Sequence, residues 1–196
     1  MSNILSTNFF ESAEIVSITQ TRISETMSNK SHKRSIGGQR WALSLSSKNL
    51  TQAEMSELYA FLVKQNGPFE HFSVIPPKHG STRSTNATGT PTVTTDFAAG
   101  VTSIRANQGG GSLLTGDFIK FSNHDKVYIL TADVNQDLSS EDYFEIFPAL
   151  TTAIDNTTTI QYNNVPFKVH LESDRTAFKT GTDGTYKIDF QVGEDI

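Results

Sequence analysis

The chain has 196 residues, a net charge of −5 at pH 7 and no cysteine. This length allows one large domain or two small ones, with a substantial core. The absence of cysteine excludes disulfides, Cys-ligated zinc and Cys nucleophiles. The mixed, net acidic charge argues against nucleic-acid binding as the main function. Residues 81–166 carry the whole excess, with four basic and nine acidic residues, which indicates a separate unit.

No stretch of the chain approaches the ~18 apolar residues of a transmembrane helix. The N-terminal residues also lack the basic start and the apolar run of a signal peptide. We therefore expect a protein that is soluble where it is made and has no membrane partner.

The first part of the chain predicts two strands on either side of a polar segment. Residues 14–22 are rich in β-branched side chains and predict a strand. Residues 24–39 are polar and basic, and they predict either a flexible surface loop or a projecting arm. Residues 40–46 alternate between large apolar and smaller side chains, which predicts a half-buried strand with Trp41 in the core.

A helix is predicted over residues 52–65, with signals at both ends. Thr51 is the expected N-cap, and Glu54 stands three residues later, where it completes a capping box. The sequence Asn66-Gly67-Pro68 predicts the end of the helix, because Gly adopts the left-handed cap and Pro cannot continue a helix. The apolar face predicted by the helical spacing contains Met55, Leu58, Tyr59 and Leu62.

The middle of the chain predicts a series of short strands. Residues 69–75 predict a strand, the Thr- and Ser-rich residues 80–95 predict a linker, and the glycine-containing residues 107–112 predict a flexible loop. Further strands are predicted at 101–105, 117–122, 126–133, 143–147 and 158–162. This many short strands in under 90 residues suggests a small barrel.

Regular alternation resumes near the C-terminus. Residues 167–171 and residues 186–192 each predict a strand. A C-terminal strand needs partners from earlier in the chain, and the natural ones are the strands around Trp41 and Ile15.

The predicted fold is therefore mainly β, with two domains. Residues 1–80 and 167–196 are expected to form one discontinuous β-sandwich domain with one packed α-helix. Residues 81–166 are expected to form a small barrel inserted into it.

The histidines are the first candidates for chemistry. His32 lies in a basic cluster and is expected to be solvated. His71 and His79 lack the spacing of a zinc pair, and His170 alternates with core side chains, so an exposed or interface position is expected. None of them forms a metal-ligand motif.

A His beside an Asp stands in Asn123-His124-Asp125. Adjacent residues on a strand point to opposite faces, so the two side chains would not pair in an extended chain. All three residue types favour turns, and we predict a turn between two strands rather than a reaction centre. Ser122 is close in sequence, but neighbours in sequence rarely form a catalytic triad.

Other candidate motifs are weak. The run Gly109-Gly110-Gly111 neither opens a helix nor carries a lysine, so it does not predict a phosphate-binding loop. The chain also lacks the common nucleophile, nucleotide and metalloprotease motifs. We predict that the protein is not an enzyme and holds no metal and no cofactor. The spacing of four aspartates does not match a calcium-binding loop, so we expect them to be solvated turn residues. They are Asp117, Asp125, Asp133 and Asp137.

Several motifs together resemble a known family. The run LLTGDFIKFSNHDKVYILT is followed by an acidic spacer, a strand ending in FPAL, and YNNVPFKVHLESD. Before it come a strand with Trp41, the capped helix TQAEMSELYAFLVKQNG and the Phe-rich FEHFSV. This order over residues 36–192 resembles the distal tail proteins of siphoviruses (long-tailed bacteriophages), of the type with an inserted OB-fold domain.

The resemblance implies a structural role in the virion. Such proteins form a hexameric ring at the tail tip that joins the tail tube to the baseplate hub or tail fibre and surrounds the channel through which DNA leaves. The implied partners are further copies of the chain, the tail tube protein, and baseplate hub or tail-fibre proteins, with no specific nucleic-acid binding. The implied location is the phage tail tip, after assembly in the cytoplasm of the host bacterium. The resemblance also implies that residues 81–166 form an OB-like domain.

Two sets of candidate contact residues follow. The basic segment could be the arm that contacts a neighbouring subunit, which makes Lys30, Lys33 and Arg34 candidate interface residues. An alternative function is a carbohydrate-binding module of a tail tip, because OB-like barrels often bind saccharides. Tyr128 and Tyr143 are then the candidate aromatic platform.

Overall fold

The structure is a computed structural model that describes residues 4–5, 7–136 and 142–196. Strands account for 51% of it and helical residues for 10%, so the fold is mainly β, as predicted. The described strands form two sheets, which is consistent with a β-sandwich.

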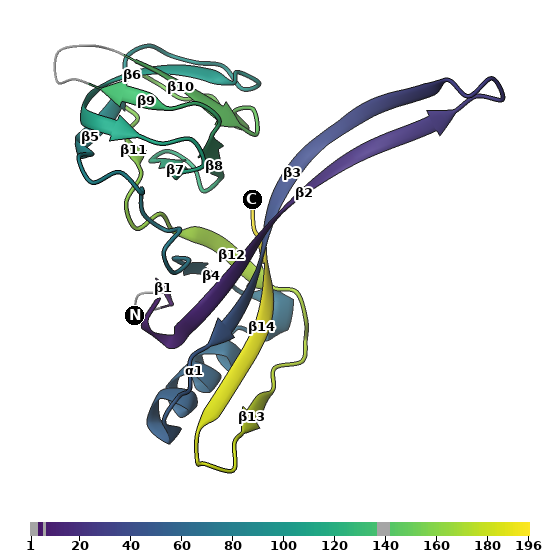
Figure 1. The fold of residues 1–196 in the computed structure, drawn as a ribbon, viewed down its shortest axis with the longest axis vertical. Helices are drawn as coiled ribbons and strands as arrows, with labels where there is room; N and C mark the ends of the chain where they lie inside the picture. The colour runs from purple at the N-terminus through teal and green to yellow at the C-terminus, as the bar shows by residue number, and fades with distance from the viewer. Residues whose placement is uncertain (1–3, 6, 137–141) are drawn as a thin grey trace. The chain divides into compact units, whose positions relative to one another are not determined.

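Two compact units divide the chain. Unit 1 contains Met1–Asn8, Phe72–Lys168 and Asp195–Ile196, and unit 2 contains Phe9–His71 and Val169–Glu194 (Figure 1). The predicted domain boundaries, after residue 80 and after residue 166, stay predictions, because compactness alone does not show that either part folds independently.

Unit 2 is built on one sheet whose strands come from both ends of the chain. Within it, β12, β14, β3 and β2 are neighbours in that order, and β13 pairs with the outer part of β14. The pairing of the C-terminal strand with the Trp41 strand confirms the prediction, whereas the Ile15 strand pairs with β3 and not with β14. The elements are β2 (Phe10–Glu25), β3 (Ser31–Ser47), α1 (Gln52–Lys64), the 3-10 turn η2 (Gly67–Phe69), β12 (Phe167–Leu171), β13 (Phe178–Thr180) and β14 (Tyr186–Glu194).

The helix of unit 2 has the predicted ends. The Thr51 side chain accepts from the backbone N–H of Glu54, and the Glu54 carboxylate accepts from the backbone N–H of Thr51 at 2.9 Å. Asn66 and Gly67 both adopt left-handed backbone conformations just after the C-cap. The side chains that bury the helix and sheet faces are Met55, Leu58, Leu62, Trp41, Leu43, Leu45, Ile188 and Val192.

The prediction of a flexible loop at residues 24–39 is wrong. β2 continues to Glu25 and β3 begins at Ser31, so a five-residue turn joins two long antiparallel strands. The segment contains few apolar residues because neither face of this ribbon is covered, and burial is what the hydrophobic pattern reports. The alternative prediction of an arm describes the segment better (Figure 1).

Unit 1 contains the second sheet. Its strands follow the order β11, β7, β8, β10, β6, β5, with β9 also pairing with β6, and β1 pairs with β4 in parallel. The elements are β1 (Ile4–Leu5), the 3-10 turn η1 (Thr7–Phe9), β4 (His71–Val74), β5 (Thr88–Val93), β6 (Ser103–Leu113), β7 (Phe118–Phe121), β8 (Val127–Leu130), β9 (Val134–Gln136), β10 (Asp142–Phe147) and β11 (Ile160–Gln161).

Two sequence predictions in unit 1 are wrong. Residues 107–112 are the second half of the long strand β6 rather than a loop, because β5 and β9 supply backbone partners to them. A side chain at Gly111 would overlap the backbone of Asn86, so the glycine permits this close approach. Residues 80–95 are not a plain linker, since they contain β5.

The buried carboxylate of Asp117 holds the start of residues 80–95 in place. Asp117 is 3% exposed and accepts hydrogen bonds from the Thr82 hydroxyl, the Arg83 backbone and the Leu114 backbone. The Arg83 side chain also pairs with it at 3.3 Å. Asp117 is therefore a structural residue rather than a solvated turn carboxylate as predicted.

The two end strands of the unit 1 sheet, β5 and β11, approach each other without forming a regular ladder. Thr92 and Thr159 form an isolated antiparallel bridge, and the Val93 N–H donates to the Thr158 carbonyl at 2.9 Å. The described strands thus do not close into a continuous barrel. They enclose an apolar core that includes Ile104, Ile119, Phe121, Tyr128, Phe144 and Ile160.

Candidate functional site

The most unusual surface of unit 2 is the outer part of the β2–β3 hairpin, residues 18–38, which we call the arm. Every side chain of the arm is exposed, on both faces of the ribbon. In Figure 1 the two strands continue well past β14, the neighbour of β3 in the sheet. β14 pairs with β3 only at Ala42–Ser46, so both edges of the arm have free backbone groups along the described chain.

The arm begins and ends with features that the sequence supplies. The pairing register shifts around Gln20, opposite Gly37, and both Gly37 and Gly38 have positive φ angles of 84° and 75°. These bulges increase the local twist of the ribbon. At the tip, Asn29 adopts a left-handed conformation and the Thr26 N–H donates to the Lys30 carbonyl at 3.0 Å, which closes the turn.

The arm exposes apolar side chains as well as charged ones. Ile18, Ile23 and Ile36 are each about half exposed, and Met27 at the tip is fully exposed. A monomer gains nothing from aliphatic side chains on a ribbon that is solvated on both faces, since they bury no area there. Grouped exposed apolar residues of this kind mark interaction surfaces.

The basic residues of the arm divide between its two faces. In the ladder, Arg22 is directly opposite Arg34, and Ile23 is directly opposite Lys33. Directly opposed residues share one face and successive residues alternate, so Arg22 and Arg34 lie on one face and Lys33 lies on the other. The predicted interface residues Lys30, Lys33 and Arg34 are therefore all exposed on the arm, while their contact with a neighbour stays a prediction. The sequence did not single out Arg22, because its partner depends on the register shifts at Gln20.

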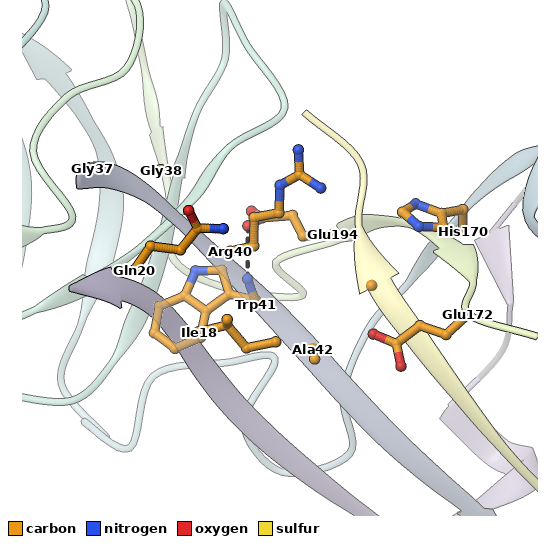
Figure 2. Close-up of a pocket in the computed structure, with 11 residues that line it drawn as sticks. Ile18, Gln20, Gly37, Gly38, Arg40, Trp41, Ala42, His170, Glu172 and Glu194 are labelled. Carbon is orange, nitrogen blue, oxygen red and sulfur yellow. Dashed lines mark hydrogen bonds between the residues drawn. The ribbon is translucent and has the colours of Figure 1, made fainter. Parts of the chain in front are cut away.

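A pocket of about 450 Å³ lies where the arm joins the sheet of unit 2, and we call it the root pocket. Figure 2 shows its lining: Arg40 and Trp41 come from β3, His170 and Glu172 come from the β12 side, and Gly37 and Gly38 come from the base of the arm. The carboxylate of buried Glu194 also lines it and accepts from the Trp41 backbone N–H at 3.1 Å. The Trp41 ring is buried, as predicted for a core residue.

The root pocket is open at Gly193. His170 is the pairing partner of Gly193, and Glu172 follows two residues later on the same face. A Cβ atom at Gly193 would lie 3.3 Å from Glu172 Oε1 and 3.5 Å from His170 Nε2. The absence of a side chain at Gly193 therefore keeps the imidazole and the carboxylate accessible from the pocket. Sequence reasoning placed His170 at an exposed or interface position and did not identify Glu172.

The turn that contains His124 has the predicted structure. β7 and β8 are antiparallel and residues 122–126 join them. His124 Nδ1 lies 2.6 Å from Asn123 Oδ1, and His124 Nε2 lies 2.8 Å from the Tyr128 hydroxyl. Burial, with a smaller contribution from Lys120, lowers the pKa of His124, so this imidazole is neutral at pH 7.

Asp125 uses different partners from its neighbour. Its carboxylate pairs with Lys120 at 2.8 Å and with Lys168 at 3.2 Å. The hydrogen bond from Lys120 is the main reason that the pKa of Asp125 is lowered. His124 and Asp125 thus belong to two separate networks and do not form a catalytic pair.

The candidate aromatic platform is only partly accessible. The ring of Tyr128 is fully buried, so it presents no face to a ligand and the prediction fails for this residue. Tyr143 on β10 is 56% exposed, and the Arg105 guanidinium lies 6.0 Å from its ring centre. Phe147 lies on the same face of β10 and is 40% exposed.

The described residues form neither a candidate metal site nor a membrane-spanning helix. Among residues 4–5, 7–136 and 142–196, no group of three or more His, Asp or Glu side chains could hold a metal ion. His32, His71 and His79 are exposed at three different places, and Asp137 lies outside the described residues. No described helix is long and apolar enough to cross a membrane.

No family model matches the chain, and no curated protein matches it.

Proposed function

We propose that this chain is a structural subunit of a ring of about six copies at the distal end of a siphovirus tail. In this role it joins the tail tube to the baseplate hub or tail fibre and surrounds the DNA exit channel. The family resemblance of the ordered sequence motifs motivates the proposal. The observation that carries it is the arm, a long β-ribbon with aliphatic side chains exposed on an otherwise solvated surface.

The energetics of the arm favour assembly. An isolated two-stranded hairpin is at best marginally stable in water, and the arm has no covering layer in its own chain. Its free edges would promote uncontrolled pairing between chains unless a specific partner covers them. A closed ring satisfies this requirement, because each subunit then offers its arm to one neighbour and a different surface to the other.

The OB-like character of unit 1 is part of the same proposal. Its sheet of short strands curves until β5 and β11 meet at the Thr92–Thr159 bridge, which supports a small, partly open barrel. In the proposed role this unit contacts peripheral tail components.

A second candidate function is saccharide binding by unit 1, and the outer face of β10 favours it. Tyr143 and Phe147 lie on that face together with Glu145, and Arg105 is opposite Tyr143. Exposed aromatic rings beside polar groups suit sugar rings, which have both apolar faces and hydroxyls. Glycan-array binding by the full chain, lost in Tyr143→Ala and kept in the control Phe178→Ala, would support this function. Absence of binding by the full chain would reject it.

Assembly of the purified chain tests the ring. Multi-angle light scattering and negative-stain imaging are expected to show rings of about six copies. A variant in which Asn-Gly replaces residues 21–36 joins the paired Gln20 and Gly37 by a two-residue turn. It should remain folded by circular dichroism and should not form rings. A wild-type chain that stays monomeric at every concentration tested would overturn the proposal.

A further inference from the structure

The arm carries a pair of like charges that its own chain does not neutralise. Arg22 and Arg34 are directly opposite each other in the β2–β3 ladder, and His32 is on the same face two pairs further out. Like charges at opposed positions repel. Among the residues that the structure describes, neither guanidinium forms an ion pair. This face of the arm therefore matches an anionic partner.

The root pocket has an excess of negative charge, which complements the two arginines of the arm. Its charged lining residues are Arg40, Glu172 and Glu194, whose formal charges sum to −1. Glu194 is bonded to the Trp41 backbone, whereas Glu172 is exposed and has no ion pair within the described ranges. The pocket volume of about 450 Å³ accommodates an arginine side chain, and Gly193 leaves the approach to Glu172 open.

We infer that the Arg22 and Arg34 face of the arm docks at the root pocket of a second copy of this chain. A guanidinium of the arm pairs with the Glu172 carboxylate of that second copy. This inference rests on the proposed ring, since it names the two different surfaces that a head-to-tail junction requires. Of the three basic residues predicted from the sequence, it assigns the anion contact to Arg34 and adds Arg22.

Two observations favour a protein partner over a nucleic acid. Ile18, Ile23 and Ile36 are exposed along the same ribbon, and aliphatic groups gain nothing against phosphates. The chain as a whole is acidic, at −5, which opposes nucleic-acid binding and supplies anionic surface to another copy. The partner lies outside the chain, because neither Arg22 nor Arg34 is within ion-pair distance of its own Glu172.

Charge reversal at each surface tests the contact. The arm variant is Arg22→Glu with Arg34→Glu, and the pocket variant is Glu172→Arg. Each is expected to weaken assembly at least tenfold in sedimentation-velocity titrations, and the wild-type ring should weaken as salt is added. The matched control is Lys33→Glu, an equal charge change per residue on the opposite face of the ribbon, which should leave assembly unchanged.

Mixing the two variants gives a sharper readout. In the mixture, the wild-type arm of the pocket variant meets the wild-type pocket of the arm variant, and the reversed arm meets the reversed pocket, so both kinds of junction have complementary charges. The mixture is expected to form rings in which the two variants alternate, although each variant alone is monomeric. Combining all three substitutions in one chain should restore rings, which also shows that the variants are folded.

The outcomes separate this inference from the proposed function. A monomeric wild-type chain overturns both. Wild-type rings that survive charge reversal at Arg22, Arg34 and Glu172 overturn the docking contact and leave the ring proposal standing. Intact rings together with loss of DNA binding in the arm variant, measured by gel shift with duplex DNA, would assign the basic face to a nucleic acid and would likewise overturn it.

Discussion

Replacing Tyr128 by Phe tests whether the His124 turn is a structural element. The Tyr128 hydroxyl lies 2.8 Å from His124 Nε2 and 2.9 Å from the Thr151 hydroxyl, and it accepts from the Thr151 backbone N–H at 3.0 Å. The ring itself is fully buried in the core of unit 1. Tyr128→Phe removes one oxygen atom, keeps the ring packing and disconnects three hydrogen bonds.

The magnitude follows from what happens to the former partners. A hydrogen bond contributes ~0.5–1.5 kcal/mol net, and a donor left buried without a partner costs ~1–3 kcal/mol. Thr151 is exposed and His124 is half-buried, so water can reach both partners after the change. We therefore expect a loss of about 1–2 kcal/mol in the free energy of unfolding, below the simple sum of three bonds.

Hydrogen exchange, measured by mass spectrometry across a urea series, gives the free energy of unfolding separately for peptides of each unit. Peptides from β7 and β8 should show the loss. The fluorescence of Trp41, the single tryptophan, reports on unit 2 and serves as an internal reference. A loss below about 0.5 kcal/mol would show that the hydroxyl network is not stabilising, and one above about 4 kcal/mol would mean that the core rearranges.

Further predictions concern the same turn, the helix and acid stability. His124→Ala should leave ring assembly by light scattering unchanged, whereas Val127→Asp should prevent unit 1 from folding, seen as rapid limited proteolysis, because that side chain is fully buried. Thr51→Ala should lower the free energy of unfolding by ~1 kcal/mol in urea titrations monitored by Trp fluorescence, while Thr51→Ser should not. The Lys120 hydrogen bond lowers the pKa of Asp125, so its contribution to stability is present above the ordinary pKa of 3.8 and is lost as the pH falls below that value. Asp125→Asn should accordingly flatten the acid limb of a plot of unfolding midpoint against pH; an unchanged limb would contradict the assigned ion pair.

Local sequence signals predicted those elements whose structure is determined locally. The helix after Thr51, the hairpin around His124 and the alternating strands 167–171 and 186–192 were all found, because capping, turn chemistry and half-burial leave a mark on neighbouring residues. The strands 88–93 and 107–113 were missed. Their threonines and glycines become strands through partners distant in the chain, which no local window contains.

The candidate site was predictable only in part. The composition of residues 24–39 left a flexible loop and an arm open, and it predicted correctly only that Lys30, Lys33 and Arg34 are exposed. The opposition of Arg22 and Arg34 depends on bulges at Gln20, and the root pocket depends on the registration of β12 with β14. Those are tertiary relations, and the sequence gives no sign of them.

The pairing of β3 with β14 has a consequence for the order in which the chain folds during synthesis. Ala42–Ser46 must wait until residues 189–193 have been synthesised before their sheet is complete. Residues 72–168, the main part of unit 1, are contiguous and emerge before β14 is synthesised. The arm pairs locally, between β2 and β3, and is available from the start. Under the proposed docking contact, a chain that lacks β14 would display the arm without Gly193 and Glu194 of the root pocket, so it would bind a neighbour through its arm and offer that neighbour no complete pocket.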